Sequence, residues 1–172
     1  MVVTCEGNHD LIENPREFYR QAEKGGLPLL RKETATVDVR GQKLQVLGFP
    51  WMTSRGIDPA AAAARMRASA QALLEKRDPK AWHLALAHHP HLWEHLAGVP
   101  LTLAGHTHGG QLMLNEEQGA GPWMFKWWSG QYRLAGRPND ALIVSNGTGN
   151  WFPVRIQAPA EIIHITLRRG AA

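Results

Sequence analysis

Three polar clusters of the sequence have the residue types of a metal site, and each directly follows an apolar stretch. They are Asn8-His9-Asp10 after residues 2–5, His88 after residues 82–87, and His106 with His108 after residues 101–104. If these stretches are strands, their carboxyl ends are where ligands gather in a sheet flanked by helices. Imidazole nitrogens and an amide oxygen suit zinc, manganese or iron, whereas calcium prefers oxygen ligands alone. The clusters therefore predict a transition-metal site.

The most specific cluster is the segment Gly105-His106-Thr107-His108-Gly109-Gly110-Gln111. Its two histidines are two residues apart, so in an extended segment they would project to the same side. The glycines allow a tight backbone close to a bound ion or phosphate. Two nearby metal ions can then each take one histidine. A pair of exposed loop histidines is the simpler alternative, and the other two clusters weigh against it.

Other polar residues have structural interpretations. We interpret the remaining histidines as surface, helix or structural residues: His83, His89, His91, His95 and His164. Asn8 and His9 could also form a turn whose side chains cap the following helix, because Asn favours such positions. Capping and metal binding are compatible roles.

Two helices are predicted from local signals. Residues 15–22 begin with a proline suited to a first turn, and Gly25-Gly26 would end that helix. Asp58 is a suitable N-cap for an alanine-rich helix over residues 59–75, which also begins with proline. We expect this second helix to pack through Met66, Ala70, Leu73 and Leu74.

The strands predict a sheet. Residues 36–39 and 44–47 alternate in polarity around Arg40-Gly41-Gln42, which indicates a hairpin. Five further short apolar or alternating segments are predicted as strands: 2–5, 82–87, 101–104, 142–145 and 161–167.

Composition and charge limit the classes of function. The 172 residues, 44% hydrophobic and 20% charged, suit one soluble globular domain over residues 1–172. The net charge of +4 comes from scattered Lys and Arg residues, so nucleic-acid binding is not indicated. The single cysteine, Cys5, excludes an internal disulfide and multi-cysteine zinc modules. We find no signal peptide and no apolar run of the ~20 residues needed to cross a bilayer, so we expect a cytoplasmic or peripheral membrane location.

In their order along the chain, the three clusters resemble the calcineurin-like metallophosphoesterases. That family carries Gly-Asn-His-Asp/Glu, then a histidine after a strand, then Gly-His-x-His; this chain has Gly7-Asn8-His9-Asp10, His88 and Gly105-His106-Thr107-His108. The bacterial branch often described as membrane-associated phosphohydrolases is similar in further segments. These are Gly-His-Thr-His-Gly-Gly-Gln, Ser145-Asn146-Gly147-Thr148-Gly149, Pro153-Val154-Arg155 and Pro159-Ala160-Glu161-Ile162. The resemblance spans nearly the whole chain.

The resemblance implies a ligand set for two metal ions. Asn8, His88 and His106 would bind one ion, and His108 would bind the other. In such a site, two metals lower the pKa of a bridging water and clamp the phosphoryl oxygens during in-line displacement. Mn, Fe or Zn ions would serve, two in each complete family domain.

The same resemblance assigns catalytic roles to His9 and Asp10. His9 would contact the phosphate and help to protonate the leaving oxygen, and Asp10 would orient His9. An imidazole beside a carboxylate is a suitable general acid near neutral pH.

Two motifs of the family, Asp-x-His and Gly-Asp-x-x-Asp, do not occur in this chain. They supply an aspartate, a histidine and the carboxylate that bridges both metals. Without that carboxylate, two cations only about 3.5–4 Å apart would repel each other. We therefore expect weak metal binding and little hydrolysis from this chain alone, and we expect both motifs in the reading frame upstream of Met1.

The segment Trp123-Met124-Phe125-Lys126-Trp127-Trp128 has two interpretations, and Gly121-Pro122 before it indicates a loop. It can pack beside the site. Alternatively, Trp123, Phe125, Trp127 and Trp128 can make peripheral contact with a membrane interface, which would suit a lipid-linked phosphoester substrate.

These observations predict an α/β fold, a metallophosphoesterase-type sandwich of mixed β-sheets flanked by helices that lacks its N-terminal strands. The predicted function is metal-dependent hydrolysis of a phosphomonoester or phosphodiester through a binuclear centre. The alternative is a non-catalytic module that keeps one metal or anion site and acts by association.

Overall fold

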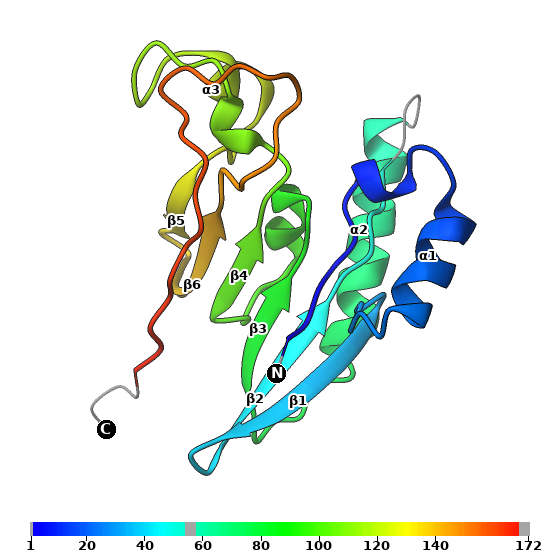
Figure 1. Ribbon diagram of the computed structural model, residues 1–172. Coiled ribbons are helices and arrows are strands. Elements are labelled where there is room, and N and C mark those ends of the chain that lie inside the picture. The colour runs from blue at the N-terminus through cyan, green and yellow to red at the C-terminus, as the bar shows by residue number, and fades with distance from the viewer. Residues whose placement is uncertain (1, 54–57, 169–172) are drawn as a thin grey trace.

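The computed structural model describes residues 2–53 and 58–168, which contain a six-stranded mixed sheet flanked by helices (Figure 1). The strand order across the sheet is β1-β2-β3-β4-β6-β5. The strands are β1 (Glu33–Val39), β2 (Gln42–Gly48), β3 (Trp82–Leu86), β4 (Leu101–Ala104), β5 (Gly130–Leu134) and β6 (Arg137–Val144). The predicted α/β class is confirmed.

The central strands run parallel and the outer strands antiparallel. β2, β3, β4 and β6 pair in parallel, while β1 joins β2 and β5 joins β6 as antiparallel neighbours. The predicted hairpin of β1 and β2 is present, and Arg40 and Gly41 turn it with φ angles of 54° and 77°. Two positive φ angles are typical of a tight hairpin turn. Because the central strands are parallel, the segments that follow them leave the sheet at one edge.

The helices begin where their caps predict. In α1 (Pro15–Lys24), Asn14 accepts a hydrogen bond from Glu17 N; in α2 (Pro59–Leu74), Asp58 accepts one from Ala61 N. Each cap satisfies an N–H group that lacks a partner within the helix. The shorter helices are α3 (Ala120–Met124) and the 3₁₀ helices η1 (His9–Leu11), η2 (Pro90–His95) and η3 (His108–Gly110). None of the helices in the described ranges is long and apolar enough to span a membrane.

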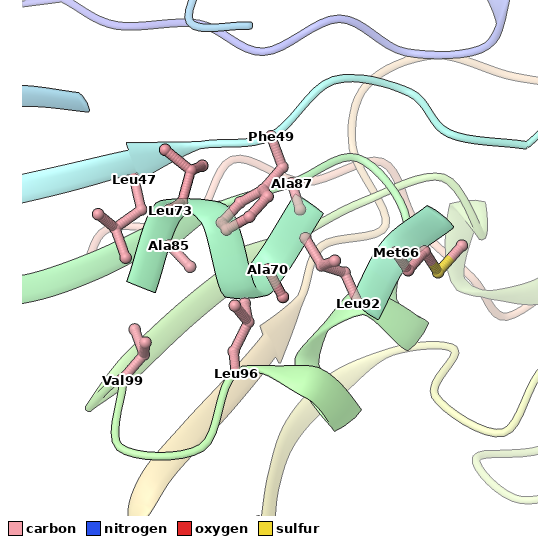
Figure 2. Close-up of a cluster of buried hydrophobic side chains, with 10 residues drawn as sticks. All are labelled: Leu47, Phe49, Met66, Ala70, Leu73, Ala85, Ala87, Leu92, Leu96 and Val99. Carbon is pink, nitrogen blue, oxygen red and sulfur yellow. The ribbon is translucent and has the colours of Figure 1, made fainter. Parts of the chain in front are cut away.

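The main core lies between the sheet and α2. Figure 2 shows its ten buried side chains, which come from the sheet, from α2 and from η2 and the residues after it. Met66, Ala70 and Leu73 of α2 are buried as predicted, and Leu74 is partly buried against the same cluster. A fully buried leucine contributes about 1.5–3 kcal/mol. This packing holds β2, β3 and the segments after them in a fixed arrangement.

The opposite face of the sheet is apolar and only partly covered. Side chains alternate between the two faces of a strand, and Ala85, which belongs to the core beside α2, separates Leu84 from Leu86. Leu103 pairs with Leu86, and Ile143 pairs with Leu103, so these side chains share the face away from α2. All four are partly exposed. This face is suited to further packing.

Two of the predicted strands are wrong. Residues 2–5 make a single bridge between Thr4 and Leu29, and Val2 is 70% exposed. Residues 161–167 have no strand partner among the described residues, and Ile162 is 89% exposed. Alternating polarity fits a strand but does not show whether a neighbour exists to pair with its backbone groups.

Other boundaries also differ from the prediction. The strand predicted at 142–145 extends from Arg137 to Val144, because β5 pairs with it between those two residues, with a register shift between Arg133 and Leu134. β5 itself was not predicted, since it is short and has only two apolar side chains. α3 covers part of the segment predicted as a loop.

Candidate metal centre

The side chains of Asn8, His88 and His106 meet at one point. Asn8 Oδ1 lies 3.0 Å from His88 Nε2 and 3.1 Å from His106 Nδ1, although 98 residues separate Asn8 from His106 in the chain. The rings of the two histidines face each other edge to face, with centroids 5.1 Å apart. Three of the predicted ligands therefore lie together.

The parallel strands β3 and β4 position the two histidines. Gly105 N donates to His88 O at 3.1 Å, which extends the strand pairing to the site itself. The turn that carries Asn8 packs directly against the His88 ring: a Cβ added at Gly7 would lie 2.9 Å from His88 Cε1. Only glycine fits this approach without movement of the imidazole.

Both histidines of the cluster are neutral near neutral pH. Removal of the rings from water lowers the pKa of His88 to about 4, although the Asp10 charge acts in the opposite direction, and it lowers the pKa of His106 to about 3. A neutral imidazole is the form that binds a metal ion, because the binding nitrogen needs a free lone pair. The ring nitrogens of His88 and His106 can therefore bind a metal ion at neutral pH.

The two separations from Asn8 Oδ1 are close to those between ligand atoms of a transition-metal ion. Nitrogen and oxygen ligands about 2.1 Å from a tetrahedral ion lie about 3.4 Å from each other. The distances from Asn8 Oδ1, 3.0 and 3.1 Å, differ from that value by a few tenths of an ångström, which side-chain rotation can supply. Asn8, His88 and His106 are thus suited to hold one ion.

Trp51 forms one wall of the cluster and was missed from the sequence. Its ring centroid lies 5.6 Å from that of His88, 5.5 Å from that of His89 and 4.9 Å from that of His106. Trp51 follows the end of β2, as His88 follows β3 and His106 follows β4. Its position after a strand at the same sheet edge is the signal that could have identified it.

His89, interpreted from the sequence as a surface or helix residue, caps η2 and also belongs to this region. Its ring stacks on His106 with centroids 5.0 Å apart and an interplanar angle of 26°. Its Nδ1 accepts a hydrogen bond from His91 N at 3.2 Å, which caps η2. Burial lowers the pKa of His89 to about 3. His89 therefore adds a neutral planar surface beside His106.

A buried carboxylate connects the Asn8 turn to this wall. Glu6 is 1% exposed; its Oε1 accepts from Trp51 N at 2.9 Å and its Oε2 from Arg31 Nε at 3.0 Å. Arg31 in turn lies over the Tyr19 ring, 3.5 Å from its centroid. Buried charge needs such partners. Glu6 is two residues before Asn8 and accepts a hydrogen bond from Trp51 N, so it joins the turn that carries Asn8 to the segment that carries Trp51.

His108 makes no hydrogen bond to Asn8, His88 or His106 among the described residues. Its Nδ1 donates to Gly149 O at 2.8 Å, so Nε2 carries the free lone pair that a metal ion would use. Arg155 holds this arrangement, since its guanidinium donates to His108 O at 3.1 Å and to Ala158 O at 2.7 Å and also bonds Gly149 O. His108 is therefore held by Gly149 and Arg155, and not by the residues that hold His106.

The backbone of the Gly-His-Thr-His segment is not extended. His106 and His108 have φ angles of 74° and 52°, in the left-handed region. The segment is therefore not extended, as the same-side argument assumed, and the two histidines have different partners: His106 contacts Asn8 and His108 contacts Gly149. Such backbone costs about 1–3 kcal/mol per residue and clusters at functional sites.

His9 and Asp10 are exposed on η1. They border a cavity of about 320 Å³ whose other lining residues are Ile12, Glu13, Asn14, Glu17 and Phe18. Asp10 Oδ2 accepts from Gly7 N at 2.8 Å and thereby stabilises the turn that carries Asn8 and His9. No bond joins Asp10 to His9 among the described residues, so the predicted orienting role would act through the turn.

The capping interpretation of Asn8 is not supported. Asn8 makes no side-chain capping bond to η1, and its amide oxygen faces the two histidines instead. Asn14 caps the following helix α1.

Carboxylates do not complete the cluster within the described ranges. Among residues 2–53 and 58–168, no group of three or more His, Cys, Asp or Glu side chains is arranged to hold a metal ion. The Asn8 cluster reaches three ligands only because an amide oxygen is one of them.

The aromatic segment 123–128 begins in α3, and some of its side chains are buried while others are exposed. Trp127 is buried, with its ring centroid 5.2 Å from that of Trp93, and Phe125 lies 5.7 Å from His106. Trp128 is partly buried. Trp123 is 81% exposed, so the membrane interpretation depends mainly on that side chain.

A scan against models of protein families finds no match to this chain, and a search of curated proteins finds no similar sequence. A functional proposal therefore depends on the geometry of the site and the order of its motifs.

Proposed function

We propose that this chain carries part of the binuclear centre of a calcineurin-like metallophosphoesterase and that the centre hydrolyses phosphoesters. One observation carries the proposal. Asn8 Oδ1 lies within 3.1 Å of a ring nitrogen of His88 and of a ring nitrogen of His106, although the three residues come from different segments of the chain. The motif order that carries the family resemblance names the same three residues. Chance exposure of loop histidines would not bring them together.

Each site residue then has a task that its surroundings suit. Asn8, His88 and His106 would hold one ion, and His108, with Nε2 free, would serve a second. The ions would supply Lewis acidity and a water of lowered pKa. His9 stands exposed beside a cavity, where an imidazole can give a proton to a leaving oxygen.

The fold that we propose is the metallophosphoesterase sandwich. The partly exposed apolar face formed by Leu84, Leu86, Leu103 and Ile143 supports it, since a second sheet packed there would bury these side chains. The second layer is a proposal that rests on this face and on the family resemblance.

A non-catalytic metal-binding module is the second candidate. It is favoured by the neutral character of the Asn8 cluster, which offers no carboxylate to bridge two cations among the described residues. Such a module would take up one ion and bind a partner or anion without turnover.

Hydrolysis of bis(p-nitrophenyl) phosphate by the purified chain with Mn²⁺ separates the two candidates. We expect slow, Mn²⁺-dependent hydrolysis that His9→Ala abolishes, because the leaving oxygen then lacks its acid. His164→Ala is the matched control, since His164 is exposed on the C-terminal segment, and it should retain the wild-type rate. Mn²⁺ uptake without any turnover would favour the non-catalytic module; neither uptake nor turnover would contradict both.

A further inference from the structure

Three aromatic side chains, Trp51, Phe125 and Trp151, line one side of the candidate site and are named here the aromatic arc. Trp51 lies 4.9 Å from His106, and Phe125 lies 5.7 Å from the same ring. Phe125 is 6.1 Å from Trp151, which is 5.4 Å from His108. The arc therefore runs from the Asn8 cluster to the position of the second histidine.

Each member of the arc remains partly exposed. The three come from different segments: Trp51 after β2, Phe125 directly after α3, and Trp151 after β6. Centroid separations of 4.5–7 Å are those at which aromatic rings attract one another. The arc and the imidazoles beside it thus form a connected set of rings, tilted by 42–78° to one another, that solvent can reach.

The backbone of the arc is fixed by buried groups. Trp51 N donates to Glu6, and Trp151 N donates to Gln111 Oε1 at 2.8 Å. Gln111 is fully buried and also donates to Val154 O at 2.8 Å. A surface that is held before a ligand arrives loses less conformational entropy on binding. The hydrogen bonds of Trp51 N and Trp151 N therefore favour binding of a ligand by the arc.

We propose that the aromatic arc binds a planar unsaturated ring in the organic part of the phosphoester, so that the site prefers aryl or nucleobase-type esters over small alkyl esters. The inference rests on the proposed function, because it requires the phosphate to be held at the metal cluster. A planar ring gains affinity from stacked or edge-to-face contact with protein aromatic groups, and the arc offers such contacts beside the position proposed for the phosphate.

Calorimetric titration of the full chain in Mn²⁺ with four probes tests the inference: inorganic phosphate, methyl phosphate, phenyl phosphate and phosphocholine. We expect phenyl phosphate to bind at least about five-fold tighter than methyl phosphate. Trp151→Leu and Phe125→Leu should each reduce that ratio, while their affinity for inorganic phosphate changes less than about two-fold. Trp123→Leu is the matched control, because Trp123 is 81% exposed and has no ring contact to the arc among the described residues; it should keep the ratio.

The outcomes separate this inference from the proposed function. If Mn²⁺ or inorganic phosphate does not bind, the proposed function fails and the inference fails with it. If both bind but phenyl phosphate is no tighter than methyl phosphate, only the inference is overturned. Phosphocholine binding tighter than phenyl phosphate would also overturn it, because the arc would then be a cation site. A phenyl preference that both arc variants retain would place the ring elsewhere.

Discussion

At the scale of single residues, Asn8, His88 and His106 meet at the centre of the site, and the rings of Trp51 and His89 lie against them. Asn8, His88 and His106 follow apolar segments, and that position was enough to expect them at one sheet edge. Trp51 and His89 contact the same rings, but their roles arise from packing across distant segments. The left-handed backbone of His106 and His108 was also unpredictable, because local preference favours other conformations for histidine.

Gly7 is the residue on which the approach of the Asn8 turn to His88 depends. Gly7→Ala would place a methyl group 2.9 Å from His88 Cε1, so we expect destabilisation of about 1–3 kcal/mol and weaker Mn²⁺ binding. Urea unfolding and metal titration measure the two effects. Gly136→Ala is the control, since a Cβ there meets nothing within 4 Å. Equal behaviour of the two variants would contradict the described packing.

Cys5 precedes this turn, and its reactivity reports on the same environment. Burial, with the nearby Glu6 and Asp10 charges, raises the pKa of the Cys5 thiol from 9.0 to about 12. We expect alkylation by iodoacetamide at pH 8 to be roughly a hundred-fold or more slower in the folded chain than in concentrated urea, because thiolate is the reactive form.

The direction of the pH effect follows from the raised pKa. The unfolded chain releases the thiol proton first, so the free energy of unfolding should fall as pH rises above 9.0. Alkylation of the folded chain should accelerate over the same range. Equal alkylation rates at pH 8 with and without urea would refute this account of Cys5.

At the scale of elements, caps and periodicity predicted α1, α2 and the β1–β2 hairpin, because those signals act within a few residues. The segments 2–5 and 161–167 were predicted wrongly as strands, since pairing depends on a neighbour that local sequence does not reveal. β5 is the opposite case. It has few apolar residues and was not predicted, yet it is a strand because it pairs with β6.

A pair of substitutions distinguishes the buried helix from the exposed C-terminal segment. Leu73→Ala in α2 removes a fully buried side chain and should cost about 2–5 kcal/mol. Ile162→Ala should change the free energy of unfolding by less than about 0.5 kcal/mol, because Ile162 is 89% exposed. Chemical denaturation measures both. A large loss for Ile162→Ala would show that residues 161–167 pack as the sequence first suggested.

At the scale of the whole molecule, the α/β class followed from alternating helical and strand signals. The arrangement of the sheet did not, because the order β1-β2-β3-β4-β6-β5 depends on which segments pair over long distances. One face of this sheet packs on α2, and the other keeps partly exposed leucines. The Asn8 cluster lies at the edge where the parallel strands end, as expected of a ligand site in such a sheet.

Metal titration tests the central claim most directly. Calorimetry with Mn²⁺ and with Zn²⁺ on the wild-type chain should show one site that His106→Ala and His88→Ala each abolish, because either change leaves two ligands of three. His164→Ala should bind as the wild type does, since that histidine is exposed and outside the cluster. Undiminished binding by His106→Ala, or no binding by the folded wild-type chain, would contradict the assignment of Asn8, His88 and His106 as a metal site.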